Sequence, residues 1–155
     1  MSSARAQANH KLYLAKIQLA GWQRASEAHD IPAVTLAQAF LPAVRAHLLD
    51  AYGWFLLAVS GAEQFPDNLP RRCAELPGTA VGKAVPGEIR EFALLENEGW
   101  LAGLLQPPDE AVRATRAPGN LAVAAPAGPD CDQAQHWINQ LEALFDRMSD
   151  SLDEY

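Results

Sequence analysis

The stretch Trp137-Ile-Asn-Gln-Leu-Glu-Ala-Leu-Phe-Asp-Arg-Met-Ser-Asp-Ser-Leu152 repeats its apolar side chains at intervals of three and four residues. In an α-helix, at about 100° per residue, these side chains fall on one stripe and the polar ones lie opposite. The stripe consists of Trp137, Leu141, Leu144, Met148 and Leu152, widened by Ile138 and Phe145. Because one helix cannot bury such a stripe alone, the sequence predicts a helix over about 132–152 that packs within an all-α fold.

Two further long helices are expected in the first part of the chain. The first covers residues 4–29, where Leu12, Leu19 and Trp22 belong to one apolar stripe. The second covers residues 32–60 and ends at Gly61. Between them, an aspartate at position 30 and a proline at position 32 are typical of one helix ending and the next being capped.

The second helix is apolar on more than one side. Leu49, Leu56 and Leu57 lie away from its main stripe, which passes through Phe55. A helix that is apolar all round is either central in its own fold or shared at an interface with another chain. Pro42 removes a helical hydrogen bond, so we expect a kink there, or two helices that meet there.

The remaining residues predict a weaker fourth side of the bundle. Two short helices are expected at about 87–96 and 99–106, because Asn97-Glu98-Gly99 breaks the apolar pattern. Residues 61–87 and 107–130 are rich in proline and glycine and predict long connectors, with a short helix near 69–76 in the first of them. The expected fold is an all-α, up-and-down bundle of about four helices in one domain over residues 1–155, with its third member split in two.

Composition narrows the class of protein. The chain has 155 residues, 49% of them hydrophobic, and a formal net charge of −7. An acidic chain repels a phosphate backbone, so no nucleic-acid partner is expected. The absence of a membrane-spanning run and of a signal peptide predicts a cytoplasmic protein with no membrane partner. Cys73 and Cys131 are expected to be free thiols, as in a reducing compartment.

Charge is segregated along the chain. The first 26 residues carry four basic side chains and no acid, whereas the last 26 carry seven acids and one base. Glu142, Asp146, Asp150 and Asp153 fall on one line of the last helix. This line is either a solvated face or is attracted to the basic first helix, in the same bundle or in a partner subunit.

Side chains able to do chemistry are sparse. His47 and Asp50 share one edge of the second helix, and a histidine–carboxylate pair can orient a general base. The alternative is a hydrogen-bonded pair at the margin of the bundle, because no serine or cysteine nucleophile with a supporting motif accompanies it. The chain contains no Glu-x-x-His sequence and no glycine-rich phosphate loop, so neither a metal nor a cofactor is expected. The four tryptophans are expected in the core or at its rim.

Four stretches of the chain carry a resemblance to a known family. Asn9-His-Lys-Leu-Tyr-Leu-Ala15, continuing to Trp22-Gln-Arg-Ala25, is followed by Ala46-His-Leu-Leu-Asp-Ala-Tyr-Gly53. Trp100-Leu-x-x-Leu-Leu105 and Trp137-x-x-x-Leu-x-x-Leu144 come later. Together they resemble a small uncharacterised family of helical proteins from Pseudomonas and related gammaproteobacteria, known only as a domain of unknown function. Pro42 departs from the pattern of that family. The resemblance implies a cytoplasmic bacterial helical protein of about this length, and it implies no substrate.

If the chain has a binding site, we expect it among the polar residues within those stretches. These are Asn9, Lys11 and Tyr13 on the first helix, with His47 and Asp50 on the second. The function expected first is a non-enzymatic protein-interaction or dimerisation module, with a second copy or an unknown protein as partner. The alternative is a small-ligand-binding or hydrolytic helical domain that uses His47 and Asp50. The sequence leaves open whether the chain is an enzyme.

Overall fold

The computed structural model describes residues 3–61, 64–76, 87–106 and 130–153, with side chains up to position 148 in the last range. Its long helices are α1 (Ala4–Glu27), α2 (Ala33–Ser60) and α6 (Cys131–Asp153). The shorter elements are α3 (Gly87–Glu98), α4 (Trp100–Leu105) and the 3-10 turn η1 (Cys73–Glu75). The described part of the chain holds helices and irregular segments and no strand, which confirms the all-α prediction.

The observed helices lie close to the predicted ones. α1, α2 and α6 begin and end within two residues of their expected positions, and the third member is split into α3 and α4 as expected. Of the short helix expected near 69–76, only the turn η1 forms. α2 ends at Gly61, whose φ of 69° is the left-handed conformation that glycine adopts readily. The connector expected over 107–130 lies, apart from its last residue, outside the described residues.

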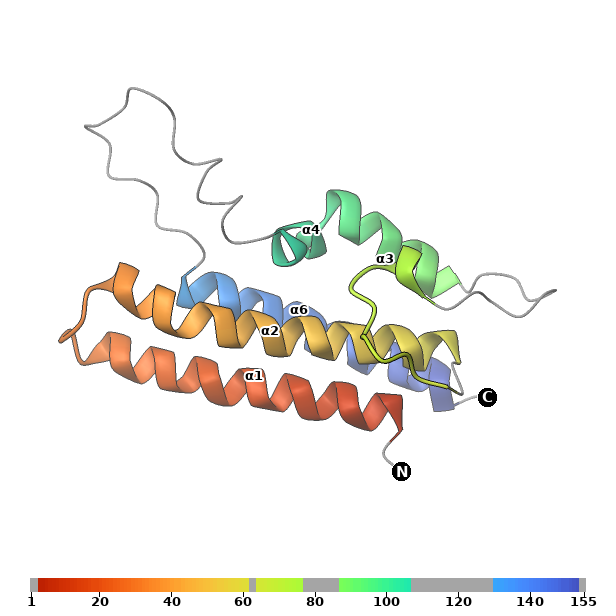
Figure 1. The fold of residues 1–155 in the computed structure, drawn as a ribbon, viewed down its shortest axis with the longest axis horizontal. Coiled ribbons are helices and arrows are strands. Elements are labelled where there is room, and N and C mark those ends of the chain that lie inside the picture. Colours follow the sequence, from red (N-terminus) through yellow and green to blue (C-terminus); the bar gives the residue numbers. More distant parts are fainter. Residues whose placement is uncertain (1–2, 62–63, 77–86, 107–129, 154–155) are drawn as a thin grey trace, which may run out of the picture.

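The three long helices lie side by side, and the two short ones cover them from one side (Figure 1). α1 packs along α2, and α6 contacts both of these helices. α3 and α4 lie above α2 and α6, on the side away from α1 (Figure 1). The result is an uneven bundle with three long members and a short, broken fourth one.

α2 is the central helix of this bundle, because it contacts α1, α3, α4 and α6. Its additional apolar residues Leu49, Leu56 and Leu57 are all buried within the chain. The central position of α2 therefore explains why it carries apolar residues on all sides, and no interface with another chain is needed to cover them. The expectation of two helices meeting at Pro42 is wrong, since α2 runs through this residue without a break. Pro42 is exposed, and the buried Leu41 and Val44 anchor the helix on either side of it.

Aromatic side chains join the layers. Trp22 of α1 lies parallel to Phe40 of α2, with ring centroids 6.3 Å apart. Phe55 of α2 stacks on Phe145 of α6 at 4.2 Å and meets Phe92 of α3 at 5.7 Å. These contacts tie three helices that are distant in sequence to one point of the core.

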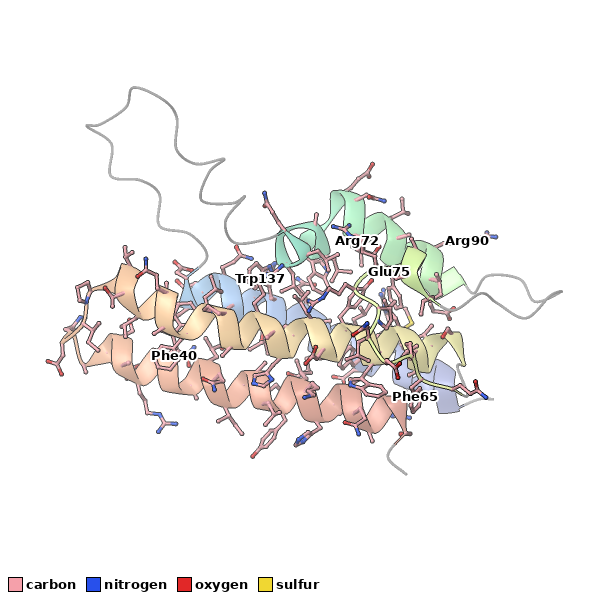
Figure 2. The ribbon with its side chains drawn as sticks, in the orientation of Figure 1. Phe40, Phe65, Arg72, Glu75, Arg90 and Trp137 are labelled. Atoms are coloured by element: carbon pink, nitrogen blue, oxygen red, sulfur yellow. The ribbon has the colours of Figure 1, made fainter. Side chains whose placement is uncertain are left out.

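The four tryptophans lie where they were predicted, in the core or at its rim. Trp22 and Trp137 are buried, and Trp54 and Trp100 are half-buried against the core. Figure 2 shows Trp137 on α6 close to α4.

A basic side chain of α1 and an acidic side chain of α6 pair with one another within the chain. Lys16 of α1 forms an ion pair with Glu142 of α6, with nitrogen and oxygen 2.6 Å apart. Two turns further along both helices, the side-chain amide of Gln23 donates to Gln135 at 3.3 Å. The attraction expected between the basic first helix and the acidic last one therefore operates in the same bundle at Glu142.

Candidate functional site

The predicted site residues lie on α1 and α2 but face different ways and do not form one pocket. Lys11 and Asp50 come together, with nitrogen and oxygen 3.9 Å apart, because antiparallel packing brings the start of α1 beside the second half of α2. Asn9 and Tyr13 are exposed, and His47 is half-buried. Both residues were candidates, but their pairing was not foreseen, because the sequence indicates the helices and not the register between them.

Asp50 also borders a polar hollow between α2 and residues 67–75. The hollow has a volume of about 460 Å³, and its lining residues are Leu49, Asp50, Asp67, Asn68, Leu69, Arg71 and Glu75. Glu75 accepts hydrogen bonds from the backbone N–H groups of Arg71 and Arg72 at 2.8 and 2.9 Å, which fixes the wall of the hollow. Figure 2 shows Arg72 and Glu75 on the segment between α2 and α3. His47 is not among the lining residues, so the hollow reaches only one member of the predicted pair.

Residues 69–70 can run close along α2 because Gly53 offers them a gap. A side chain at Gly53 would place its Cβ 2.6 Å from the carbonyl oxygen of Pro70 and 3.1 Å from Leu69. Both distances are shorter than ordinary contacts, so a larger residue would push this segment away from the helix. Gly53 thus positions the turn η1, which follows directly.

Behind that turn lies a buried polar cluster made by Tyr52 of α2, Cys73 of η1 and Glu96 of α3. Glu96 is 7% exposed and is the one charged side chain that is buried among the described residues. Its Oε1 accepts a hydrogen bond from the Tyr52 hydroxyl at 2.5 Å and another from the Cys73 backbone N–H at 2.9 Å. The Cys73 Sγ lies 3.9 Å from the Tyr52 hydroxyl and donates to the Ile89 carbonyl at 3.6 Å. Three elements therefore meet at one carboxylate.

The electrostatics of this cluster keep its protons in place. Burial, together with the hydrogen bond and the charge of Glu96, raises the pKa of the Cys73 thiol to about 12. Burial and the same carboxylate raise the pKa of Tyr52 well above its usual range. A thiol that stays protonated near neutral pH is a poor nucleophile. The cluster is consequently a structural joint between α2, α3 and η1 rather than a set of activated groups.

Sequence reasoning missed this cluster, although one signal for it exists. The sequence predicts Cys73 as a free thiol, which the structure confirms, but it assigns no contacts to this residue. Glu96 follows Ile89 and Phe92 at helical spacing, on the buried face of α3. A charged residue in register with a buried face indicates a buried carboxylate that needs donors. Nothing in the sequence identifies which donors those are.

The outward face of α1 is the other distinctive surface. Tyr13 and Ile17, four residues apart, are 60% and 50% exposed, and no acid occurs between Ala4 and Ser26. The buried residues of α1 lie on the opposite side of the helix, against α2 and α6. Large apolar side chains gathered on one helix face are typical of surfaces that contact other proteins.

A shallow groove of about 340 Å³ separates α3 from α6. It is lined by Glu91, Leu95, Trp100, Gln140, Ala143, Leu144 and Arg147. At its rim, Arg147 pairs with Glu91, with nitrogen and oxygen 2.6 Å apart. Neither this groove nor the polar hollow holds a metal-ligand set, since no three His, Cys, Asp or Glu side chains of the described residues are grouped to bind an ion. Of the helices described, none is both long and apolar enough to cross a lipid bilayer.

Comparison with known proteins gives a family and no activity. The model of a family of unknown function (DUF6586) matches residues 1–155, so the chain belongs to that family. No curated protein and no solved structure matches the chain. Any function therefore has to be argued from the surfaces described above.

Proposed function

We propose that this member of the family of unknown function DUF6586 is a protein-interaction module whose binding surface is the outward face of α1. The observation that supports this most is the exposure of Tyr13 and Ile17 on adjacent turns of a helix whose inner side is fully used by the core. Exposing two large apolar side chains is unfavourable in water, at roughly 25 cal/mol per Å² of apolar surface. A partner that covers them gains that free energy.

The face is also distinct in charge from the rest of the molecule. The chain carries a net charge of −7, yet α1 has no acid before Glu27. Two of its cations are compensated inside the chain, because Lys11 pairs with Asp50 and Lys16 with Glu142. The apolar face is therefore not surrounded by the acidic charge that repels macromolecules elsewhere on this protein. The cytoplasm as its place is part of the same proposal and is supported by the two free thiols.

Site-specific photo-crosslinking in the producing cell tests this proposal. Benzoylphenylalanine replaces Ile17 in one variant and Leu94 in a matched control, since Leu94 is 63% exposed on α3. We expect an ultraviolet-dependent protein adduct at position 17 and none at position 94. No adduct at position 17, or equal adducts at both positions, would show that the α1 face is not the binding surface.

A second candidate function is the binding of a small polar ligand in the hollow beside Asp50. The observation that favours it is the volume of about 460 Å³, which suits a small metabolite, and the presence of both acidic and basic side chains on its wall. Binding or hydrolysis with His47 as a general base is the weaker form of this idea, because His47 does not line the hollow.

Ligand-induced stabilisation distinguishes this second candidate from the first. A library of polar metabolites is screened by thermal shift against the native chain, Asp50→Asn and Asp146→Asn, the last being exposed on α6. A ligand of the hollow stabilises the native chain and Asp146→Asn but not Asp50→Asn. A library that shifts all three proteins equally, or none of them, argues against the hollow as a site.

A further inference from the structure

We propose, resting on the function proposed above, that the partner of the α1 face is a second copy of this chain, bound with its α1 antiparallel about a two-fold axis near residue 15. The surface that carries this inference is a seam of outward residues. It consists of Ala6, His10, Tyr13, Ile17, Ala20 and Arg24, each exposed except the half-buried Ala20.

The spacing of this seam is that of a coiled coil. Its residues follow one another at intervals of four, three, four, three and four, so they stay on one side of α1 from Ala6 to Arg24. Read in the opposite direction, the intervals are the same. An antiparallel second copy therefore presents an identical row of positions, which is the condition for a two-fold symmetric interface.

The side chains of the seam complement one another in this register. Tyr13 faces Ile17 of the second copy, so the two large apolar residues meet at the centre. His10 faces Ala20, and Ala6 faces Arg24, so each long polar side chain lies opposite a small one. A parallel pair would instead place each residue against its own copy, with Arg24 beside Arg24, which brings like charges together.

One charge at each end of the seam, that of Glu27, favours the same orientation. Glu27, the last residue of α1, lies level with Ser3 of the second copy in this register. Ser3 caps the N-terminus of α1, accepting a hydrogen bond from the Ala6 N–H at 3.1 Å, and a helix N-terminus attracts negative charge. Along the flanks, Lys16 is already paired with Glu142 of its own chain. The arrangement thus adds one favourable contact at each end, which offsets the less favourable place of Arg24 beside the first turn of the second copy, and it leaves no uncompensated lysine at the centre.

The size of the seam predicts a weak dimer. One pair of 24-residue helices buries an area at or below the low end of stable interfaces, roughly 1,200 Å². We expect a dissociation constant on the order of 10–100 µM. Because its centre is apolar, this constant should change less than about threefold between ~0.1 and ~0.5 M NaCl. An acidic partner held by the cations of α1 would dissociate over the same range.

Sedimentation equilibrium of the full chain tests the proposal with single variants at the centre of the seam. Tyr13→Lys and Ile17→Glu should each weaken the dimer at least about tenfold, whereas Leu94→Lys should leave it unchanged. Thermal denaturation confirms that each variant is folded, as expected for exposed positions. A native chain that is monomeric at all concentrations up to ~1 mM overturns the second copy as partner. An adduct at position 17 in the cell would then still support the interaction function with another protein.

Mixing the variants tests the register itself. Tyr13→Lys combined with Ile17→Glu sets the new lysine opposite the new glutamate and leaves Ile17 against Tyr13, so a heterodimer should form with affinity within about tenfold of the native dimer. Tyr13→Lys combined with Tyr13→Glu does not oppose the two charges and should not restore the dimer. Equal restoration in both mixtures overturns the antiparallel register. A dimer that survives both single variants overturns the α1 seam as its interface, whereas the proposed binding surface is still decided by the crosslinking at position 17.

Discussion

The long-helix layer and the short-helix layer of this molecule are held together by different interactions. α1, α2 and α6 contact one another along apolar stripes, and their ion pairs Lys11–Asp50 and Lys16–Glu142 lie at the partly exposed rim. α3 and α4 are too short to bury comparable surface, and polar bonds complete their attachment. Glu96 binds Tyr52 and the Cys73 backbone, while Arg45 of α2 donates to the carbonyls of Leu104 and Leu105 at 3.1 Å. Apolar area fixes the long layer, whereas the short one is fixed by apolar contacts, such as Phe92 with Phe55, together with directional hydrogen bonds.

The point where the two layers meet should be the most sensitive to substitution. Phe55→Ala removes the ring that contacts both Phe145 of α6 and Phe92 of α3, and leaves a cavity at the centre of the core. We expect a loss of about 3–5 kcal/mol in the free energy of unfolding, measured by urea denaturation. Phe65→Ala is the matched control, because Phe65 is 43% exposed, and its loss should stay below about 1.5 kcal/mol. Similar losses for both would show that Phe55 does not join the layers.

Removing the buried carboxylate should loosen the short layer more than the long one. Glu96→Ala leaves the Tyr52 hydroxyl and the Cys73 N–H without their acceptor, which should lower the free energy of unfolding by about 2–4 kcal/mol. Glu96→Gln keeps an acceptor oxygen and should lose less. Hydrogen exchange measured by mass spectrometry should rise first in η1 and α3 and remain low in α1. A uniform rise over all helices would contradict the division into two layers.

Alkaline pH should act on the same cluster without a mutation. The folded chain holds the pKa of Cys73 at about 12, above the usual thiol value of 9.0, and the pKa of Tyr52 is also raised. Between pH 9 and pH 12 the unfolded chain has released protons that the folded chain still holds. The contribution of these groups to the free energy of unfolding is therefore fully present below pH 9 and falls as the pH rises towards 12. Cys73→Ala should reduce this slope in a series of urea denaturations at increasing pH. If the free energy of unfolding of Cys73→Ala fell with pH as steeply as that of the native chain, the thiol would not contribute to the pH dependence.

The smallest effect is expected at the rim of the long layer. Lys16 and Glu142 are 43% and 45% exposed in their side chains, so water screens their attraction despite the 2.6 Å separation. A double-mutant cycle with Lys16→Ala and Glu142→Ala should give a coupling of about 0.2–1 kcal/mol that shrinks at high salt. If the coupling free energy were as large as the loss in the free energy of unfolding of Glu96→Ala, polar contacts at the rim and in the core would not differ in strength as argued.

The same contrast explains what could be predicted from the sequence. The periodic apolar residues of α1, α2 and α6 gave their bounds to within two residues, because burial of a stripe leaves a repeating pattern. Asn97-Glu98-Gly99 also indicated the break between α3 and α4. The polar contacts of Glu96, Arg45 and Asp50 join residues that are 23 to 60 positions apart in the sequence. Such contacts depend on how the helices are aligned against one another, and no local sequence pattern records that alignment.

The central place of α2 also has a consequence for how the chain is made. α1 can cover one side of α2 as soon as both have left the ribosome, because they are neighbours in sequence. The opposite side waits for Phe145, about 90 residues after Phe55. At ~5–20 residues per second, synthesis of that interval takes roughly 5–20 s. During this time the nascent α1–α2 hairpin exposes an apolar face of α2 to solvent and to any chaperone near the ribosome exit. The folded protein buries this face.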